Sequence, residues 1–137
     1  MNGRCFVDTN IIIYAHLTNE RKKHEIASAL LKDKMVDSSI WISTQILSEF
    51  YSAMSKNMIA HNKIMEFMTP LIRNMNIIAV SLETVENALF IKDKYQFSYW
   101  DSLMLSAAIE SNSDKVYSED LQHGQIVESR LTIVNPF

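Results

Sequence analysis

The chain has 137 residues, of which 47% are hydrophobic, so its length fits one domain with a core of its own, and we expect a single domain over residues 1–137. The sequence lacks a run of about 18 apolar residues, so it predicts no membrane span. Its single cysteine excludes a disulfide framework, and its two glycines are too few for the glycine-rich loops of nucleotide sites. The formal net charge of −3, from 13 Lys and Arg against 16 Asp and Glu, argues against a general nucleic-acid binder with a basic excess. We expect a cytoplasmic protein.

The first half of the chain alternates short apolar runs, which predict strands, with longer apolar periodicities, which predict helices. Asp8 directly follows the first apolar run and, like Asn10, is able to cap the helix that begins there. Thr44 is expected to cap a helix whose apolar stripe continues to Met54. In chain order, this half predicts strands over residues 4–7 and 40–42, and helices over residues 11–17, over residues 22–35 and after Thr44.

The second half continues the alternation, and one of its helices contains a proline. The apolar stripe from Ile64 to Met75 predicts a helix, which Pro70 should kink or split. Leu89 and Trp100 belong to apolar stripes and are expected to face the core. Short strands that alternate with helices predict an α/β fold, with a parallel sheet covered by helices on both faces. This half also predicts strands over residues 77–80, 115–117 and 131–134, and helices over residues 82–95 and 98–110.

Four acidic residues are placed where a parallel sheet would bring them together. Ligands of such sheets bind outside the carboxyl ends of the strands. Asp8 and Asp120 each follow a predicted strand, whereas Glu49 and Asp101 each lie near the start of a predicted helix. We call Asp8, Glu49, Asp101 and Asp120 the acidic quartet.

Each of these acids also has an ordinary structural explanation. Asp8 could simply cap the helix that follows it, and Asp101 could belong to a capping box that begins at Ser98. Glu49 could be an exposed helix residue, and Asp120 could lie in a polar turn. Their joint placement, rather than any one of them, favours a functional site.

Four carboxylates in one place would repel one another, and their pKa values would rise. A hard divalent cation removes that penalty, because Mg²⁺ and Mn²⁺ prefer oxygen ligands. Such a site can activate a water molecule and stabilise charge on a phosphodiester. The sequence contains no His and Cys cluster with metal-ligand spacing and no Ser or Cys nucleophile arrangement. The pattern favours metal-dependent phosphodiester hydrolysis.

Four segments occur in a recognisable order, namely "FVDTNIIIYA", "SEF" with Glu49, "YWDSLMLSAA" and "VYSEDLQHG…LTIVNPF". Together they resemble the PIN domain, and in particular the single-domain PIN toxins of VapBC toxin–antitoxin pairs. The resemblance runs from about residue 4 to the end of the sequence. It implies a three-layer α/β/α sandwich with a short, mostly parallel central sheet. It also implies a Mg²⁺-dependent endoribonuclease, with Mn²⁺ as an alternative cation, that acts as a type II toxin on a structured RNA such as tRNA. The partners that it implies are an antitoxin protein and a second copy of the chain in a homodimer.

The resemblance also assigns roles to residues of this chain. Asp8 and Asp101 would bind the metal directly, and Asp120 would be a further ligand, direct or through water. Glu49 would hold a metal-bound water or help deprotonate the attacking water, which cleaves RNA to a 5′-phosphate and a 3′-hydroxyl. Many members carry a further acid where this chain has Gln122, so the number of metals stays open, and Glu119 could compensate. Supporting positions that match the family are Thr9, Asn10, Ser118 and Glu119.

Two other functions compete with this interpretation. A non-catalytic PIN-fold module could bind RNA or a protein, although an intact acidic quartet argues against it. A phosphatase of the haloacid-dehalogenase type also has an aspartate after its first strand. That chemistry needs Asp-x-Asp, and the third residue here is Asn10.

Several other features have a structural and a functional interpretation. The histidines are expected to be packed or solvated, although His123 could touch substrate, and Cys5 is expected to be a small buried hydrophobe. Five methionines, which we expect mainly to fill the core, could instead line an antitoxin groove. Removing the four acidic-quartet charges from the net −3 leaves +1, so the acidity does not exclude an RNA substrate. The methionines are Met54, Met58, Met65, Met68 and Met75, and the candidate phosphate contacts are Arg21, Lys22, Lys23, Lys92 and Lys94.

Overall fold

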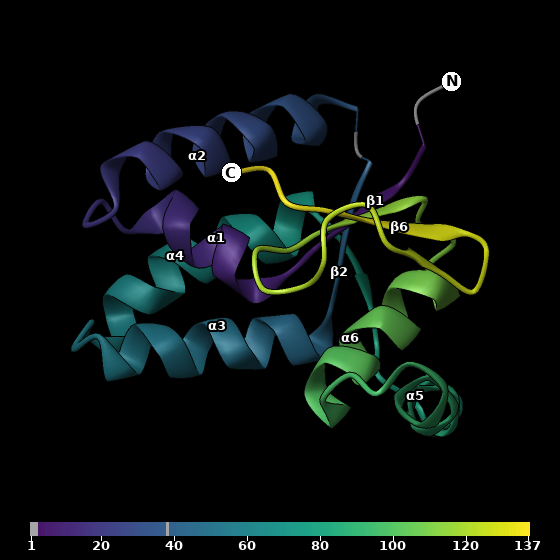
Figure 1. Cartoon of the computed structure of the whole chain (residues 1–137). Helices are drawn as coiled ribbons and strands as arrows, with labels where there is room; N and C mark the ends of the chain where they lie inside the picture. The colour runs from purple at the N-terminus through teal and green to yellow at the C-terminus, as the bar shows by residue number, and fades with distance from the viewer. Residues whose placement is uncertain (1–2, 38) are drawn as a thin grey trace.

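A computed structural model describes residues 3–37 and 39–137, and within them one six-stranded sheet forms the centre of the molecule (Figure 1). The strands lie in the order β3-β2-β1-β4-β6-β5. All neighbouring pairs are parallel except β5 with β6. The strands are β1 (Cys5–Val7), β2 (Ile40–Ser43), β3 (Asn76–Ile78), β4 (Lys115–Tyr117), β5 (Ile126–Val127) and β6 (Leu131–Val134). The prediction of a short, mostly parallel sheet is confirmed.

Six helices of the described residues cover the two faces of this sheet in two groups (Figure 1). They are α1 (Thr9–His16), α2 (Arg21–Val36), α3 (Thr44–Lys56), α4 (His61–Asn74), α5 (Leu82–Tyr95) and α6 (Tyr99–Glu110). The chain adds β2 and then β3 on one side of β1, and afterwards returns to the other side of β1 to form β4. Because crossovers between parallel strands are right-handed, this reversal moves the connecting helices to the opposite face. The predicted α/β/α arrangement therefore follows, with α1 to α4 on one face and α5 and α6 on the other.

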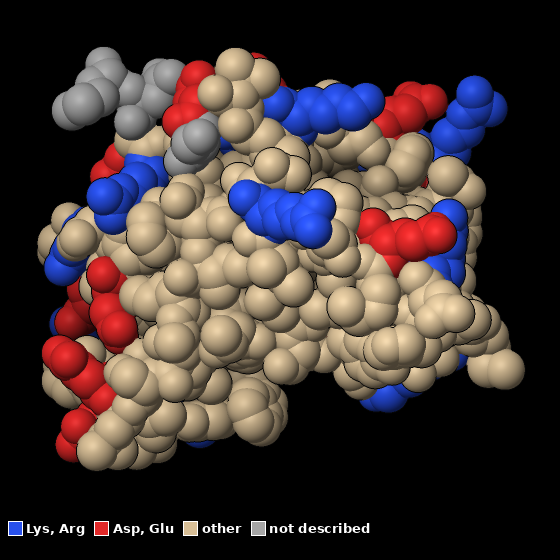
Figure 2. Space-filling model, turned by 180° about the vertical axis from the view of Figure 1, so that it is seen from behind, with Lys and Arg blue, Asp and Glu red and all other residues tan. Residues whose placement is uncertain are grey.

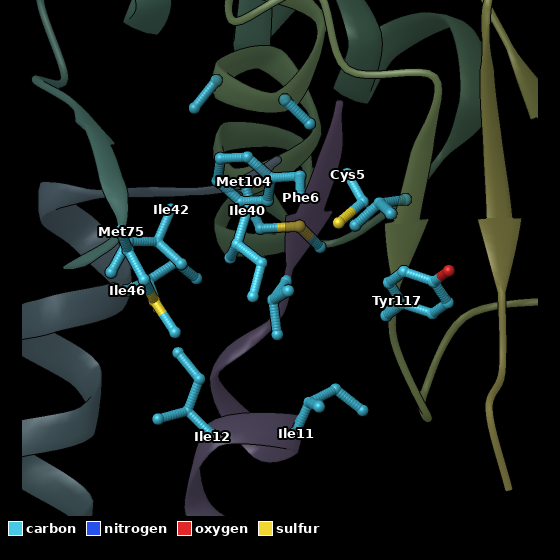
Figure 3. Packing of buried hydrophobic residues seen from close by; sticks show 14 of the residues in the cluster. Cys5, Phe6, Ile11, Ile12, Ile40, Ile42, Ile46, Met75, Met104 and Tyr117 are labelled. Carbon is cyan, nitrogen blue, oxygen red and sulfur yellow. The ribbon is translucent and has the colours of Figure 1, made fainter. Parts of the chain in front are cut away.

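The core lies between the sheet and both groups of helices (Figure 3). Phe6 of β1 and Ile42 of β2 are completely buried. Ile42 lies beside Ile46 of α3 on one face of the sheet, and Phe6 lies beside Met104 of α6 on the other. Each fully buried side chain of this size contributes about 1.5–3 kcal/mol to folding. The short strands are therefore held by packing on both faces, as their nearly continuous apolar sequences indicate.

Thr44 was wrongly predicted as a helix cap, and the split that was one of the two outcomes predicted for Pro70 does not occur. The N-cap of α3 is Ser43, whose hydroxyl accepts a hydrogen bond from the Ile46 backbone N–H at 3.4 Å, and Thr44 is the first helical residue. Pro70 does not split α4, which continues through it to Asn74. Pro70 is exposed, and so is Glu66, whose carbonyl loses its helical partner. Water can therefore satisfy that carbonyl, and the helix remains continuous.

The apolar stripes of α5 and α6 were also assigned partly to the wrong face. The side chains of Leu89 and Trp100 are 55% and 62% exposed instead of buried. These two helices pack mainly on each other, so α6 is buried on most sides from Ser102 to Ala108. Strand β5, which pairs antiparallel with β6, was not predicted at all, because it is only two residues long.

The methionines divide between core and surface. Met54 and Met75 are buried and Met68 packs against the core, as the core-filling interpretation predicts. Met58 is 90% exposed, and Met65 is exposed as well. Cys5 is buried in β1, as expected. No helix among residues 3–37 and 39–137 is both long and apolar enough to cross a membrane.

Candidate active site

Asp8 lies at the point where the order of the sheet reverses, between the carboxyl ends of β1 and β4. Its backbone N–H continues the pairing of the two strands by donating to the Tyr117 carbonyl at 2.9 Å. One side-chain oxygen accepts from the Thr9 N–H at 2.7 Å, which caps α1. The other accepts from the buried Ser118 hydroxyl at 2.8 Å. These bonds fix the carboxylate at the position where open α/β sheets bind their ligands.

Glu49 reaches the same position from α3. Its Oε1 accepts from the Thr9 hydroxyl at 2.7 Å, so Thr9 connects Glu49 to Asp8 through its two donors. Its Oε2 accepts from the Gln45 amide at 3.3 Å. The same amide donates to the Trp100 carbonyl at 3.0 Å and thereby ties α3 to the start of α6. Gln45 and Thr9 together hold both oxygens of Glu49.

Asp101 and Asp120 approach the site from α6 and from the loop after β4. The Asp101 backbone N–H donates to the Ser98 hydroxyl at 3.1 Å, so Ser98 caps α6 and sets the first turn that carries Asp101. Asp120 is exposed, and its Oδ2 accepts from the Asn10 amide at 3.1 Å. Asn10 thus connects Asp120 to the first turn of α1. All four acids of the quartet converge on one edge of the sheet.

The electrostatics of the site show how strongly these carboxylates affect one another. Burial raises the pKa of Asp8 to about 6, and the charges of Asp101 and Glu49 add to the rise, against the opposing hydrogen bonds from Ser118 and Thr9. The pKa of Asp101 is raised as well, first by burial and then by the charges of Asp120 and Glu49. No Lys or Arg of the described residues forms an ion pair with any acid of the quartet. The site is therefore rich in uncompensated negative charge.

Glu119, expected to support the site, makes a different set of contacts. Its Oε1 accepts from the Tyr14 hydroxyl at 2.7 Å, and its Oε2 forms an ion pair with Lys23. Burial alone would raise the pKa of Glu119, but Lys23 and Tyr14 outweigh it and hold that pKa below its usual value. Glu119 therefore anchors the loop next to Asp120, and Tyr14 and Lys23 engage its two oxygens. Lys23, expected to contact RNA phosphate, is engaged by Glu119.

The site's donors match the oxygen ligands that Mg²⁺ and Mn²⁺ prefer. Two amide oxygens beside the carboxylates, Asn10 Oδ1 and Gln45 Oε1, are buried and have no hydrogen-bond partner among the described residues. Both oxygens lack the hydrogen-bond partner that buried polar atoms usually have. No three His, Cys, Asp or Glu side chains within the described ranges are gathered closely enough to form a metal-binding group as they stand. The donor types fit a divalent cation, although the acids are not drawn together around one point.

Sequence comparison with family models gives one assignment that covers most of the chain. The model of the PIN domain matches residues 5–128, a range that includes all four acids of the quartet. The chain belongs to the PIN domain family. No curated protein matches this PIN domain in a direct comparison of sequences.

Several solved structures share the fold of this PIN domain at low sequence identity. VapC20 of Mycobacterium tuberculosis, described as a sarcin-ricin loop cleaving toxin, is 18% identical with a TM-score of 0.69, over 85% of this chain and 89% of that one. A toxin–antitoxin complex from Klebsiella pneumoniae is 17% identical with a TM-score of 0.70, over 97% and 98%. VapBC2 of Rickettsia felis, bound to a DNA fragment from its promoter, is 16% identical with a TM-score of 0.69, over 96% and 98%. These likenesses show that the fold is that of VapC toxins.

Sequence reasoning missed several residues that hold the site in place. Gln45 precedes Glu49 by one helical turn, and this spacing could have indicated the contact between them. Tyr14 and Lys23 gave no such signal, because their contacts with Glu119 cross from α1 and α2 to the loop after β4. The histidines bond to the protein as expected, including His123, whose ring accepts from the Asn135 N–H at 3.0 Å.

Proposed function

We propose that this PIN domain is a Mg²⁺-dependent endoribonuclease that hydrolyses RNA phosphodiester bonds at the acidic quartet. The observation that carries the proposal is the placement of four carboxylates within electrostatic reach of one another near the reversal point of the sheet, with no Lys or Arg of the described residues paired to them. Such a cluster is unfavourable until a cation binds. Mn²⁺ would serve in place of Mg²⁺, because it takes the same oxygen ligands.

We assign the proposed roles to the acids and to the residues that orient them according to their positions in the site. Asp8 and Asp101 are the proposed metal ligands, because they are the two acids whose pKa values burial and neighbouring charge raise. Asp120 is proposed as a further ligand. When bound, a divalent cation supplies the positive charge that stabilises the phosphodiester in the transition state. Ser118, Thr9 and Asn10 orient the acids through the hydrogen bonds described above.

Glu49 is proposed to orient the attacking water and to accept its proton. Both of its oxygens are held by a donor, from Thr9 and from Gln45. A carboxylate has about four lone-pair directions, so each oxygen can still accept one bond from water. The fixed orientation places the free lone pairs without any rearrangement of α3. This arrangement suits a general base, because a base must lie within hydrogen-bond distance of the proton that it removes before its pKa matters.

We further propose that the protein is the toxin of a type II toxin–antitoxin pair and acts in the cytoplasm as a homodimer. Support comes from the toxin–antitoxin complexes whose fold it shares. The proposed substrate is a structured RNA such as tRNA. The fold neighbour that cleaves the sarcin-ricin loop supports a target of this structured class.

The test is an RNA cleavage assay with Mg²⁺ that compares the wild type with Asp8→Asn. Asp93→Asn is the matched control, because it makes the same change at an exposed position of α5. The proposal requires cleavage by the wild type and the control, with 5′-phosphate and 3′-hydroxyl ends, and a loss of about 100-fold or more in Asp8→Asn. Equal activity of all three proteins would defeat the assignment of the quartet, and tight RNA binding without cleavage would favour a non-catalytic module.

A further inference from the structure

A cavity of about 720 Å³ opens between α3 and α6, directly beside the acidic quartet. Glu49 forms part of its wall, so the cavity continues the proposed catalytic site. Its volume falls within the range of about 300–1,000 Å³ that small-molecule sites occupy. Seen from behind, the lower outline of the molecule is indented between the side that carries α5 and the side that carries α3 (Figure 2). The wall residues that the argument uses are Gln45, Ser48, Glu49, Lys56 and Trp100.

Trp100 presents an aromatic surface to this cavity. It directly precedes Asp101 in the first turn of α6, and 62% of its surface is exposed. Its backbone is fixed by the bond from Gln45 to its carbonyl, and the Tyr99 ring packs edge-on against the indole at 5.1 Å. An exposed, well-supported indole next to a nuclease site is suited to stacking on an unpaired nucleobase.

The polar face of α3 supplies the other groups that a nucleotide needs. Lys56, at the end of the helix, is exposed and forms no ion pair with any described residue. It lies seven residues after Glu49, which is about 10 Å along the helix axis. That separation suits a phosphate next to the scissile one. The exposed Ser48, which also lines the cavity, provides a hydroxyl for a base edge.

We propose that the cavity between α3 and α6 is a nucleotide subsite, in which Trp100 stacks on a base beside the scissile phosphate and Lys56 contacts an adjacent phosphate. This inference rests on the proposed ribonuclease function and adds the position of the substrate. Its occupant is an unpaired segment of RNA, because stacking needs a base that is free of its partner strand. The positive charge of Lys56 complements the RNA backbone, and Glu49 is the acid of the quartet that lines the cavity with it.

The experiment measures binding of a short, fluorescently labelled single-stranded RNA of random sequence in the Asp8→Asn background, which suppresses cleavage. Trp100→Ala should weaken binding about tenfold, and Trp100→Phe should retain most of it, because a phenyl ring can still stack. Lys56→Ala should weaken binding. It should also reduce the slope of log K against log salt concentration by about one, as expected for one lost phosphate contact. Phe90→Ala is the matched control, since Phe90 is a similarly exposed aromatic on α5, at 57%.

A second readout reports on Trp100 itself. The Trp41→Phe variant leaves Trp100 as the only indole, and the RNA should quench its fluorescence if a base stacks on it. Equal affinity of Trp100→Ala and Phe90→Ala, without quenching, would overturn the subsite. So would a change in molar mass by light scattering in Trp100→Ala at unchanged RNA affinity, because that result would make this face a contact between copies of the chain.

The outcomes separate this inference from the proposed function. If the wild type does not cleave RNA but Trp100-dependent binding and quenching persist, the subsite is supported and the nuclease assignment fails. If the wild type cleaves RNA and Trp100→Ala cleaves it with unchanged KM and unchanged positions, the nuclease assignment stands and the subsite is overturned.

Discussion

Two carboxylates that follow adjacent strands, Asp8 after β1 and Glu119 after β4, have opposite electrostatic surroundings. Glu119 pairs with Lys23 and accepts from Tyr14, and its pKa is held low. Asp8 is half-buried beside Asp101 and Glu49, and its pKa is raised to about 6. Glu119 is thus paired with a lysine of the chain, whereas Asp8 forms no ion pair with a Lys or Arg of the described residues. Because burying an unpaired charge is costly, the difference supports the proposal that a bound cation supplies the counter-charge for Asp8.

The largest expected effect is on the rate of RNA cleavage. It is tested by the same substitution, Glu to Gln, at an acid of the quartet and at the paired Glu119. Glu49→Gln should lower the cleavage rate by about 10²–10⁴-fold, because it removes the proposed base while keeping the side chain's size. Glu119→Gln should change the rate by no more than a small factor, since Glu119 only anchors the loop of Asp120. Single-turnover cleavage with Mg²⁺ measures both, and similar losses in the two variants would break the comparison.

The second prediction concerns stability without divalent cations. The folded pKa of Asp8, about 6, lies above its ordinary value of 3.8, so the native state keeps a proton that the unfolded chain has lost. Stability from this group therefore falls as pH rises from about 4, and the loss is complete above about pH 6. Asp8→Asn should remove the effect and raise the free energy of unfolding at neutral pH by at most about 3 kcal/mol.

Urea unfolding at several pH values in the presence of a chelator tests this sign. Glu119 serves as the opposite case, because its lowered pKa contributes stability that is lost as pH falls through its folded value. Glu119→Gln should therefore weaken the protein most at neutral pH, where Asp8→Asn strengthens it. A lower free energy of unfolding in Asp8→Asn at neutral pH would show that the ionised Asp8 carboxylate does not destabilise the folded protein.

The third prediction is stabilisation by the cation itself. Mg²⁺ at about 100 times its Kd should stabilise the native state by about 2.7 kcal/mol, which raises Tm by several degrees. Asp8→Asn should abolish the shift, whereas Glu119→Gln should retain it. Thermal unfolding with and without Mg²⁺ provides the measurement, and an equal shift in both variants would place the cation elsewhere.

The smallest expected effect is at the anchor of Glu119. Tyr14→Phe removes only the hydroxyl that donates to Glu119, and should lower the free energy of unfolding by about 1 kcal/mol. The edge-on contact of the Tyr14 ring with Phe137 should remain. Urea unfolding of this variant measures the contribution of the anchor, and a loss several times larger would mean that the hydroxyl supports more than one loop.

The sequence predicted the sheet and its acidic edge because both depend on local patterns. A short apolar run followed by an acid, as at Val7 and Asp8, marks a buried strand and its carboxyl end without knowledge of the rest of the fold. Capping by Asp8 was likewise predictable, since the cap and its helix are adjacent in sequence. The charges around Asp8 and Glu119 could not be predicted in this way, because they come from residues far away in the sequence.

The errors arose where tertiary packing decides the outcome. Trp100 and Leu89 continue apolar stripes, but α5 and α6 cover each other and leave these side chains outside. Pro70 occupies an exposed position of α4, where a carbonyl that lacks its helical partner is open to solvation. The ion pair of Lys23 with Glu119 joins residues 96 positions apart. No spacing rule in a single sequence reports such a contact.

The most direct test of the central claim is whether RNA cleavage depends on a divalent cation bound by the acidic quartet. Purified protein is dialysed against a chelator, and the 5′-phosphate ends produced from a structured RNA are counted before and after Mg²⁺ or Mn²⁺ is restored. We expect no cleavage without the cation and full cleavage once it returns. Cleavage that proceeds equally in the chelator would contradict the account, because the quartet would then act without its external counter-charge.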